Sequence, residues 1–272
     1  MINIAILITS FNRKSLTLKC IKKIYNQKIN SNCRIKIYLT DDNSSDQTDN
    51  IIKKKYPNIN ILKGDGNLYW TGGINKSWQA ALKDKINFDY YLWLNDDTFI
   101  YPKAISQLLN FNNFIKKREI ICVGSTKNSC NIRSYGGYIN KNFKLRVFKN
   151  DIIVPNKYYQ PINRFNGNIV LISKKAQKKI GIFNPNLKHN FSDIEYGIRA
   201  EKKNIKMVIC PGYQGICEND KKIINFKDFI LGKKIISSGF YFTRKYGGFL
   251  WPLHFLSLIY SFLKKTFIFQ GK

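Results

Sequence analysis

The sequence predicts an α/β protein with a Rossmann-like, mostly parallel sheet flanked by helices. First, short apolar runs alternate with segments whose apolar residues recur at helical spacing, which is typical of a parallel sheet covered by helices. Second, polar loops follow three of the apolar runs, at residues 10–13, 41–46 and 95–97. Because ligands bind at the carboxyl ends of parallel strands, we expect these loops to share one edge of the sheet and to form the functional site.

The first half of the chain follows this alternation in order. Its apolar runs predict strands at residues 2–9, 35–40, 59–62, 90–94 and 120–124. Between and after them, helical spacing predicts helices at residues 16–26, 46–56, 73–85 and 102–117.

The second half is less regular. Residues 135–154 alternate in polarity and contain Gly136-Gly137, which indicates a hairpin or irregular strands. A strand is expected at residues 167–173 and a helix at 192–204. Without an internal repeat or low-complexity linker, the pattern predicts one domain over residues 1–239 and a C-terminal extension over residues 240–272.

The extension has an unusual composition. Residues 249–263 contain two aromatic clusters, one Pro and one His, with no acid or strong base, and Lys264-Lys265 follow. This run is shorter than the roughly 20 residues that span a bilayer. Aromatic residues mixed with Leu and flanked by Lys favour an amphipathic helix lying in a membrane interface, although packing on the domain's own core is the alternative.

The charge is strongly unbalanced, with 46 Lys and Arg against 17 Asp and Glu, for a formal net charge of +29. Such a field favours anionic partners: nucleic acid, anionic lipid or a phosphorylated substrate. The basic residues are scattered rather than clustered, and the joint abundance of Lys, Asn and Ile is that of AT-rich genomes. We therefore expect no nucleic-acid partner and favour a membrane surface, keeping a basic nucleic-acid-binding protein as the rival class.

Cysteine usage and the first residues indicate the compartment. None of the six cysteines shows the two-residue spacing of a zinc or redox motif, and reduced intracellular thiols are expected. The apolar run at residues 1–10 has no basic residue before it, so it resembles a first strand more than a signal peptide. We expect a cytoplasmic protein, peripheral on the inner face of the cell membrane.

The most informative motif is Asn95-Asp96-Asp97, directly after the apolar run at residues 90–94. Two adjacent carboxylates at a strand end are costly without a partner. A divalent cation chelated by a diphosphate suits them, because Mg²⁺ and Mn²⁺ prefer hard oxygen ligands and keep phosphate in their shell. The alternative is a solvated turn or a helix cap.

Five segments, taken together, resemble family 2 glycosyltransferases of the GT-A fold. They are residues 9–13 (TSFNR), 38–48 (YLTDDNSSDQT), 64–75 (GDGNLYWTGGIN), 95–97 (NDD) and 192–199 (SDIEYGIR). Each motif is weak alone, but all five stand in the family's order, and the resemblance covers roughly residues 3–215.

The resemblance implies transfer of a sugar from a nucleoside-diphosphate sugar with inversion, assisted by Mn²⁺ or Mg²⁺. It makes Asp97 the metal ligand and Asp193 the catalytic base that deprotonates the acceptor hydroxyl. It assigns Trp70, Glu195 and Arg199 to the acceptor or leaving group. The nucleotide and donor would be bound by Thr9, Asn12, Asp41, Asn43, Asn67, Gly72, Gly73, Asn75 and Asp96.

Several of these residues have a structural alternative. Asp41 suits an Asx-turn, and Gly72-Gly73 can precede a helix whose free N–H groups bind a diphosphate or form an ordinary tight turn. Ser192-x-x-Glu195 has the form of a capping box, which places Asp193 in the first turn of a helix. Arg199 stands four residues after Glu195, so the two side chains can also pair along that helix.

The chain departs from the family pattern in two places. Asn95 stands where many relatives have Asp, which removes one charge from the metal motif. Residues 210–220 contain no His, so the third protein contact to the metal is unassigned. The two histidines of the chain are His189, expected in an acceptor loop, and His254, expected at the membrane interface.

We therefore expect an inverting glycosyltransferase that uses a UDP- or dTDP-sugar and a glycan or lipid-linked acceptor. Synthesis of a bacterial surface polysaccharide, such as lipopolysaccharide, O-antigen or capsule, is the expected setting, with rhamnosyl- or galactofuranosyl-type transfer the nearest kind. A sugar-nucleotide-binding relative without catalysis is the third alternative, and the presence of Asp97 and Asp193 argues against it.

Overall fold

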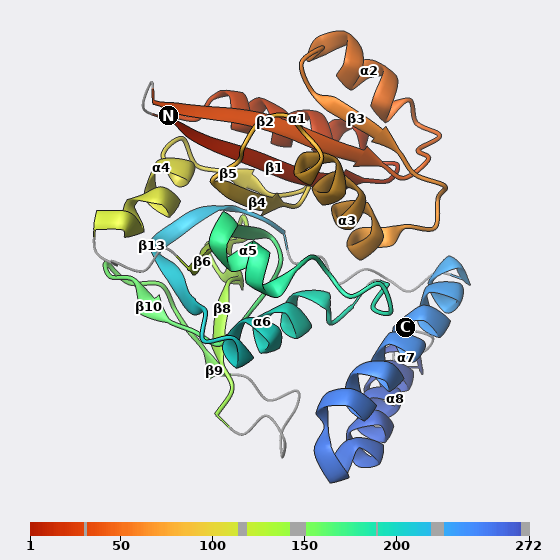
Figure 1. Ribbon diagram of the computed structural model, residues 1–272. Helices are drawn as coiled ribbons and strands as arrows, with labels where there is room; N and C mark the ends of the chain where they lie inside the picture. Colours follow the sequence, from red (N-terminus) through yellow and green to blue (C-terminus); the bar gives the residue numbers. More distant parts are fainter. Residues whose placement is uncertain (30–31, 114–118, 142–150, 189, 219–225, 268–272) are drawn as a thin grey trace.

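A single large sheet forms the centre of the molecule (Figure 1). The computed structural model describes residues 1–29, 32–113, 119–141, 151–188, 190–218 and 226–267. In this part of the chain the strand order is β10-β13-β6-β12-β4-β1-β2-β3, with β5 paired to β13 and β7 paired to β6. The strands are β1 (Ile2–Ser10), β2 (Cys33–Asp41), β3 (Asn60–Lys63), β4 (Tyr90–Leu94), β5 (Phe99–Ile100), β6 (Ile120–Lys127), β7 (Arg133–Tyr135), β10 (Gln160–Pro161), β12 (Ile169–Ser173) and β13 (Lys206–Ile216).

The strand directions bring the polar loops together. β1 is parallel to both β2 and β4, with Ser10 opposite Asp41 in the register, and β2 is parallel to β3. β12 is antiparallel to its neighbours β4 and β6, so the sheet is mixed but mostly parallel. The loops after β1, β2 and β4 therefore leave the same edge of the sheet, as the sequence predicted.

Helices cover both faces of this sheet. They are α1 (Lys14–Tyr25), α2 (Thr48–Lys55), α3 (Tyr69–Leu82), α4 (Ala104–Leu109), α5 (Lys174–Ile180) and α6 (Ser192–Lys202), with short 3₁₀ turns at Asn110–Asn113 and Gly248–Leu250.

The pleat divides β1 between two cores. Ile4, Ile6 and Ile8 pack with apolar residues of α1 and α4, whereas Ala5 and Leu7 pack with those of α3, α5 and α6. Successive side chains of a strand point to opposite faces, so one nearly unbroken apolar run supplies both cores. The predicted α/β class with flanking helices is confirmed.

Some expected elements differ in extent. The helix expected at 73–85 begins earlier, at Tyr69, and the one expected at 102–117 is α4 followed by a 3₁₀ turn, with residues 114–117 outside the described part. The sequence analysis did not identify α5 or the long strand β13. In the described part of residues 135–154 the strands are short and irregular, and residues 142–150 lie outside it. β8 (Gly137–Ile139) and β9 (Asp151–Ile152) build a small second sheet with β11 (Arg164–Phe165).

Two helices follow the sheet domain, α7 (Phe226–Tyr246) and α8 (Trp251–Phe267), and they lie side by side in Figure 1. Residue 240, the expected start of the extension, lies within α7. The buried ring of Phe242 packs with Leu187 and Ile198, so the end of α7 contacts α6 and the loop before it. Among the described residues, no helix has the length and apolar character needed to cross a bilayer.

Candidate active site

The acidic motif Asn95-Asp96-Asp97 follows β4 at the shared edge of the sheet. Nη1 of Arg13 lies 3.1 Å from Oδ1 of Asp96 and 2.8 Å from Oδ2 of Asp97, so one cation bridges the two carboxylates. Asp96 is buried, and its Oδ2 accepts a hydrogen bond from the Thr17 hydroxyl at 3.3 Å. Burial raises the pKa of Asp96 to about 6, with Arg13 opposing the rise and Asp97 adding to it.

Asp97 is more open than its neighbour, with 30 % of its side chain exposed. Its Oδ1 faces Sγ of Cys217 at 3.6 Å, directly after β13. Among the described residues, no group of three or more His, Cys, Asp or Glu side chains is arranged to hold a metal ion. One accessible carboxylate nevertheless fits Mg²⁺ or Mn²⁺, because such ions are commonly held by one or two carboxylates, substrate phosphates and water.

The loops after β1 and β2 are tied together by side chains. Oδ1 of Asn12 accepts a 2.7 Å hydrogen bond from the Ser45 N–H, and the Asn12 N–H donates to the Ser44 hydroxyl at 2.9 Å. That hydroxyl also donates to Asp41. Burial raises the pKa of Asp41, while the hydrogen bonds from Ser44 oppose the rise. Asp41 and Asn12 thus shape the loops in which the sequence placed the nucleotide.

Asp42 organises the third loop. Its Oδ1 accepts from the Gly66 N–H at 2.9 Å, and its Oδ2 accepts from the N–H groups of Leu68 and Tyr69, both at 3.0 Å. A carboxylate at the amino end of a helix satisfies free N–H groups and complements the dipole. This contact explains why α3 begins at Tyr69, four residues earlier than predicted.

The early start of α3 changes the setting of Gly72 and Gly73. They lie inside the helix rather than before it, so the expectation that they precede a helix start is wrong. A Cβ on Gly73 would lie 2.0 Å from Oγ1 of Thr9, which shows how closely α3 approaches β1. Asn75, two residues further along α3, exchanges two hydrogen bonds with the main chain of Phe183, at 3.0 and 3.1 Å. In this structure these residues pack α3 onto its neighbours.

Trp70 lies between the acidic motif and Gly167, which is hydrogen-bonded to Asp193. Its Nε1 donates a 2.8 Å hydrogen bond to Oδ1 of Asn95. Its ring lies against Gly167, where a Cβ would come within 2.4 Å of the indole. The Gly167 N–H in turn donates to Oδ2 of Asp193 at 3.0 Å. The structure thus brings Asn95, Trp70 and Asp193, distant in the sequence, into one continuous group.

Asp193 lies in the first turn of α6, as predicted. Its Oδ1 accepts a 2.8 Å hydrogen bond from the Ile194 N–H. Burial raises the pKa of the carboxyl to about 6, and hydrogen bonds from the main chain at Ile194 and Gly167 oppose the rise. Desolvation therefore outweighs these hydrogen bonds, and the carboxylate is more basic than an ordinary aspartate.

The capping box predicted for α6 is absent. The N-cap is Phe191, in a left-handed conformation and without a side-chain cap hydrogen bond. The Ser192 hydroxyl is instead hydrogen-bonded to Thr71 of α3 at 2.6 Å. Oε2 of Glu195 accepts from Arg199 at 2.9 Å, and its Oε1 accepts from the Tyr246 hydroxyl at 2.8 Å. Ser192 and Glu195, the two residues of the predicted capping box, are thus hydrogen-bonded to other side chains and not to the main chain at the start of α6.

The pairing of Arg199 with Glu195, one of the two alternatives for this residue, is confirmed. The guanidinium also donates to the carbonyl oxygens of Ile180 and Ile182, the latter at 2.8 Å. Its donors are therefore directed into the protein, toward the loop after α5. The side chains of Glu195 and Arg199 therefore stabilise the position of α6, the helix that carries Asp193.

The remaining predicted residues are placed as follows. Asn43 and Asn67 are exposed on the second and third loops, and the Asn67 N–H is bonded to Asp65 at 2.9 Å. His254 lies half-buried on α8, and His189 is outside the described residues.

Sequence reasoning did not single out Arg13, Asp42, Gly167 or Tyr246. Arg13 and Asp42 stood inside recognised motifs, and their charge was the available signal. Nothing local to Gly167 or Tyr246 indicated that they contact Asp193 and Glu195.

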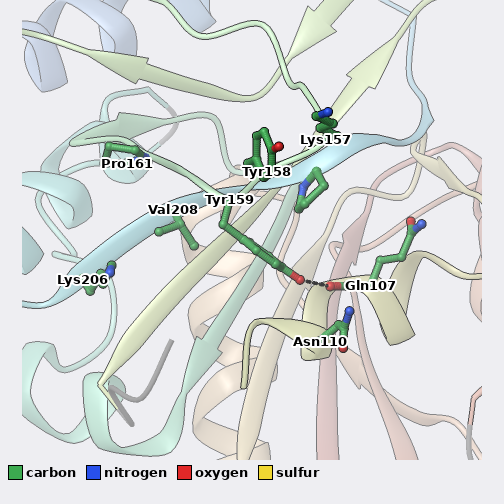
Figure 2. A pocket seen from close by; sticks show the side chains of 9 residues that line it. Gln107, Asn110, Lys157, Tyr158, Tyr159, Pro161, Lys206 and Val208 are labelled. Atoms are coloured by element: carbon green, nitrogen blue, oxygen red, sulfur yellow. Dashed lines mark hydrogen bonds between the residues drawn. The ribbon is translucent and has the colours of Figure 1, made fainter. Parts of the chain in front are cut away.

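A separate cavity of about 560 Å³ is shown in Figure 2. Gln107, Tyr158, Tyr159 and Lys206 are among its lining residues, and the Tyr159 hydroxyl donates to the Gln107 carbonyl at 2.7 Å. Lys206 begins β13, which runs parallel to β6. The cavity thus lies toward the amino ends of the strands, away from the acidic motif.

Comparison with known proteins agrees with this geometry. A mostly parallel sheet with an acidic motif after β4 and a carboxylate at the start of α6 define a GT-A glycosyltransferase. Residues 5–180 match the family described as glycosyl transferase family 2, and the chain belongs to that family.

One curated relative is the GalNAc(5)-diNAcBac-PP-undecaprenol beta-1,3-glucosyltransferase of Campylobacter jejuni. It is 24% identical over 199 residues, which cover 73% of this chain and 60% of the relative. The chain thus spans less than two thirds of that protein's length.

Three solved structures share the fold. Staphylococcus aureus TarS superposes with a TM-score of 0.60 at 13% identity, over 90% of this chain and 39% of TarS. The mannosyltransferase PcManGT from Pyrobaculum calidifontis, in complex with GDP-Man and Mn²⁺, gives 0.55 at 10% identity over 88% and 61% of the two chains. GalNAc-T7 with UDP, GalNAc and Mn²⁺ gives 0.58 at 12% identity over 78% and 43%.

Proposed function

We propose that this chain transfers a sugar, with inversion, from a nucleoside-diphosphate sugar to a hydroxyl of a glycan or lipid-linked acceptor. The observation that carries the proposal is the placement of Asp193. Its carboxylate, with a pKa of about 6, accepts a hydrogen bond from the N–H of Gly167. Gly167 lies against the ring of Trp70, which is bonded to the acidic motif through Asn95. Asp193 is the candidate base for the attacking acceptor hydroxyl, and Asp97 is the candidate ligand of a metal that stabilises the departing diphosphate. Both are needed for substitution at one anomeric carbon.

Asp193 is suited to the work of a general base. Inverting transfer needs a group that takes the proton of the acceptor hydroxyl as that oxygen attacks the anomeric carbon. A pKa near 6 leaves the carboxylate ionised at neutral pH yet more basic than an ordinary aspartate. The hydrogen bonds from Gly167 and Ile194 fix the carboxylate for that transfer.

Asp97 is the residue that we assign to a divalent cation. Mn²⁺ or Mg²⁺ bound there supplies a Lewis acid that neutralises the diphosphate leaving group. Asp97 is suited to this role because it is the exposed carboxylate of the motif, whereas Asp96 is buried against Arg13 and Thr17. The Mn²⁺ bound by PcManGT and by GalNAc-T7 supports a metal of this kind.

We place the nucleotide of a UDP- or dTDP-sugar at the loops after β1 and β2. The buried carboxyl of Asp41 stands at the end of β2, where it can accept hydrogen bonds from the N–H groups of a base. Asn12 holds the two loops in register through Ser44 and Ser45.

A lipid-linked acceptor places the enzyme at the cytoplasmic face of a membrane, in bacterial surface polysaccharide synthesis. The name of the Campylobacter relative, whose acceptor is linked to undecaprenol, supports an acceptor of this class. The exposed apolar side chains Leu253, Leu256 and Tyr260 support membrane contact, because their spacing places them on one face of α8, and the exposed Phe249 lies in the 3₁₀ turn just before that helix.

A screen of nucleotide sugars tests the function. Release of nucleoside diphosphate from UDP-, dTDP- and GDP-sugars is measured with lipid-linked acceptors, and the anomeric configuration of the product is determined by NMR. We expect turnover of one donor class, inversion, loss of activity in EDTA and its return with Mn²⁺ or Mg²⁺. Asp97→Ala should show no metal-dependent turnover. Retention of configuration or full activity in EDTA would refute the corresponding part of the proposal.

A further inference from the structure

Arg13 is the ion-pair partner of Asp97, the carboxylate at which we place the metal ion. It ends the loop after β1, at the N-cap of α1, and approaches both carboxylates of the acidic motif through the same nitrogen, Nη1. Among the described residues, Arg13 is the cation that pairs with the motif.

The two carboxylates differ in how fully the protein satisfies them. Asp96 is buried and accepts from Arg13 and from Thr17 of α1, so protein donors already hold it. Asp97 has one oxygen on Arg13 and the other facing the Cys217 thiol, a weak hydrogen-bond donor. Arg13 is thus the strong partner of Asp97, and that contact is about one-third exposed on both sides.

A divalent ion at Asp97 conflicts with this arrangement. Mg²⁺ or Mn²⁺ must come within roughly 2.0–2.2 Å of a carboxylate oxygen, closer than the guanidinium does now. Two positive charges would then stand beside the positive charge of Arg13. In the described part of the chain, Asp96 and Asp97 are the carboxylates that pair with Arg13, so both cations would share the same two negative charges until donor binds.

We propose that Arg13 is a resident counter-cation that competes with the divalent metal for Asp97 and yields it when metal and donor diphosphate bind together. This inference rests on the proposed metal site at Asp97. The diphosphate adds the negative charge that allows both cations to stay. Released from Asp97 and still held by Asp96, the guanidinium keeps free N–H groups, which suit phosphate oxygens.

The competition has a consequence for binding order. Two ligands that compete for one group are coupled, and such coupling typically changes affinity about 5- to 150-fold in both directions. Arg13 therefore weakens metal binding to the free enzyme more than to the nucleotide complex. The enzyme would take up its metal mainly together with the donor.

Mn²⁺ binding to the full chain, followed by electron paramagnetic resonance and by calorimetry, tests this inference. The proteins are the wild type, Arg13→Gln, Arg13→Lys, Asp97→Asn and Lys14→Gln. Lys14→Gln removes the same charge one residue further on and is the matched control, because the Lys14 side chain has no ion pair with the motif. Each titration is run without nucleotide and then with saturating UDP or dTDP.

Without nucleotide, we expect Arg13→Gln to bind Mn²⁺ about tenfold more tightly than the wild type, with Lys14→Gln unchanged and Arg13→Lys between. The enhancement of Mn²⁺ affinity by nucleotide should be smaller in Arg13→Gln than in the wild type. Thermal unfolding in EDTA establishes that each variant is folded, and Arg13→Lys carries the test if the Gln variant is not.

The outcomes separate the two proposals. If Asp97→Asn binds Mn²⁺ as well as the wild type, the metal site itself is misplaced. If Asp97→Asn loses Mn²⁺ but Arg13→Gln binds it no more tightly than the wild type, the metal site stands and the competition by Arg13 is refuted. Equal tightening in Lys14→Gln would reduce the effect to overall charge and would also overturn the inference.

Discussion

The hydroxyl of Tyr246 in α7 donates a 2.8 Å hydrogen bond to Oε1 of the buried Glu195 in α6. Glu195 also pairs with Arg199, so its two carboxylate oxygens have separate partners. Nearby, the stacked rings of Phe191 and Phe242 join the same two parts of the chain. The C-terminal segment therefore packs against the helix that carries Asp193 and helps to hold it in place.

Glu195→Gln should destabilise the fold more than it affects the chemistry. It removes a buried charge that accepts from Arg199 and Tyr246, and hydrogen bonds to charged groups contribute about 1.5–3 kcal/mol. We expect the free energy of unfolding, measured in urea, to fall by that order. Glu119→Gln, which breaks an exposed pair with Lys179, is the control and should cost less than about 1 kcal/mol. Equal stability of the two variants would contradict the structural role of Glu195.

Asp193→Asn should abolish most transfer while donor binding persists. An amide cannot take the acceptor proton, and removal of a general base typically costs about 10²- to 10⁴-fold in rate. In the wild type, kcat/KM should fall as the pH drops through about 6, because the base must be ionised and burial raises its pKa. Asp151→Asn, at an exposed acid on β9, is the matched control. If Glu195→Gln were the inactive variant and Asp193→Asn remained active, the base would be misassigned.

Adjacent glycines of α3 should respond oppositely to alanine. A Cβ on Gly73 would lie 2.0 Å from Thr9 Oγ1, so Gly73→Ala should cost about 1–3 kcal/mol through overpacking. On Gly72 the nearest atom is Cβ of Leu68, 3.1 Å away, so a small shift of Leu68 is enough for the gain in helix propensity of up to about 1 kcal/mol to be realised. Thermal unfolding compares the two variants. A stable Gly73→Ala would mean that α3 and β1 are less closely packed than the structure shows.

The exposed face of α8 should bind anionic membranes. Leu253, Leu256 and Tyr260 of α8, and Phe249 in the 3₁₀ turn before it, are each at least 60% exposed. Phe255, on the other side of α8, packs on Phe240. Arg244 and Lys245 in the last turn of α7, and Lys264-Lys265 in the sequence of α8, add attraction to anionic lipid. Leu253→Ser combined with Leu256→Ser should reduce sedimentation with phosphatidylglycerol vesicles severalfold.

Leu82→Ser, at an exposed leucine of α3, is the control for this measurement and should leave sedimentation unchanged. The wild type should bind less to neutral phosphatidylcholine vesicles, because these lack the negative charge that attracts the basic residues near α8. Undiminished binding of the double variant would remove α8 from the membrane contact.

The fold class, the strands from β1 to β4 and the edge of the sheet at which the site lies could all be predicted from the sequence. These features follow from local periodicity and from the rule that parallel strands end on the same side, so no distant contact is needed to predict them. The motif order likewise placed Asp97 after β4 and Asp193 in the first turn of a helix. The individual roles of the predicted site residues remain predictions.

The partners of those residues, in contrast, depend on the tertiary structure. Ser192 and Glu195 had the spacing of a capping box, but Thr71 and Tyr246 hold their side chains instead. The hydrogen bonds to Asp42 make α3 begin at Tyr69, earlier in the chain than predicted. Arg13 pairs with Asp97, which lies 84 residues away in the sequence. A buried polar group must find a hydrogen-bond partner, and the chain brings that partner from wherever the fold places one. Local sequence spacing therefore fixed where these side chains stand, whereas long-range packing fixed what they bind.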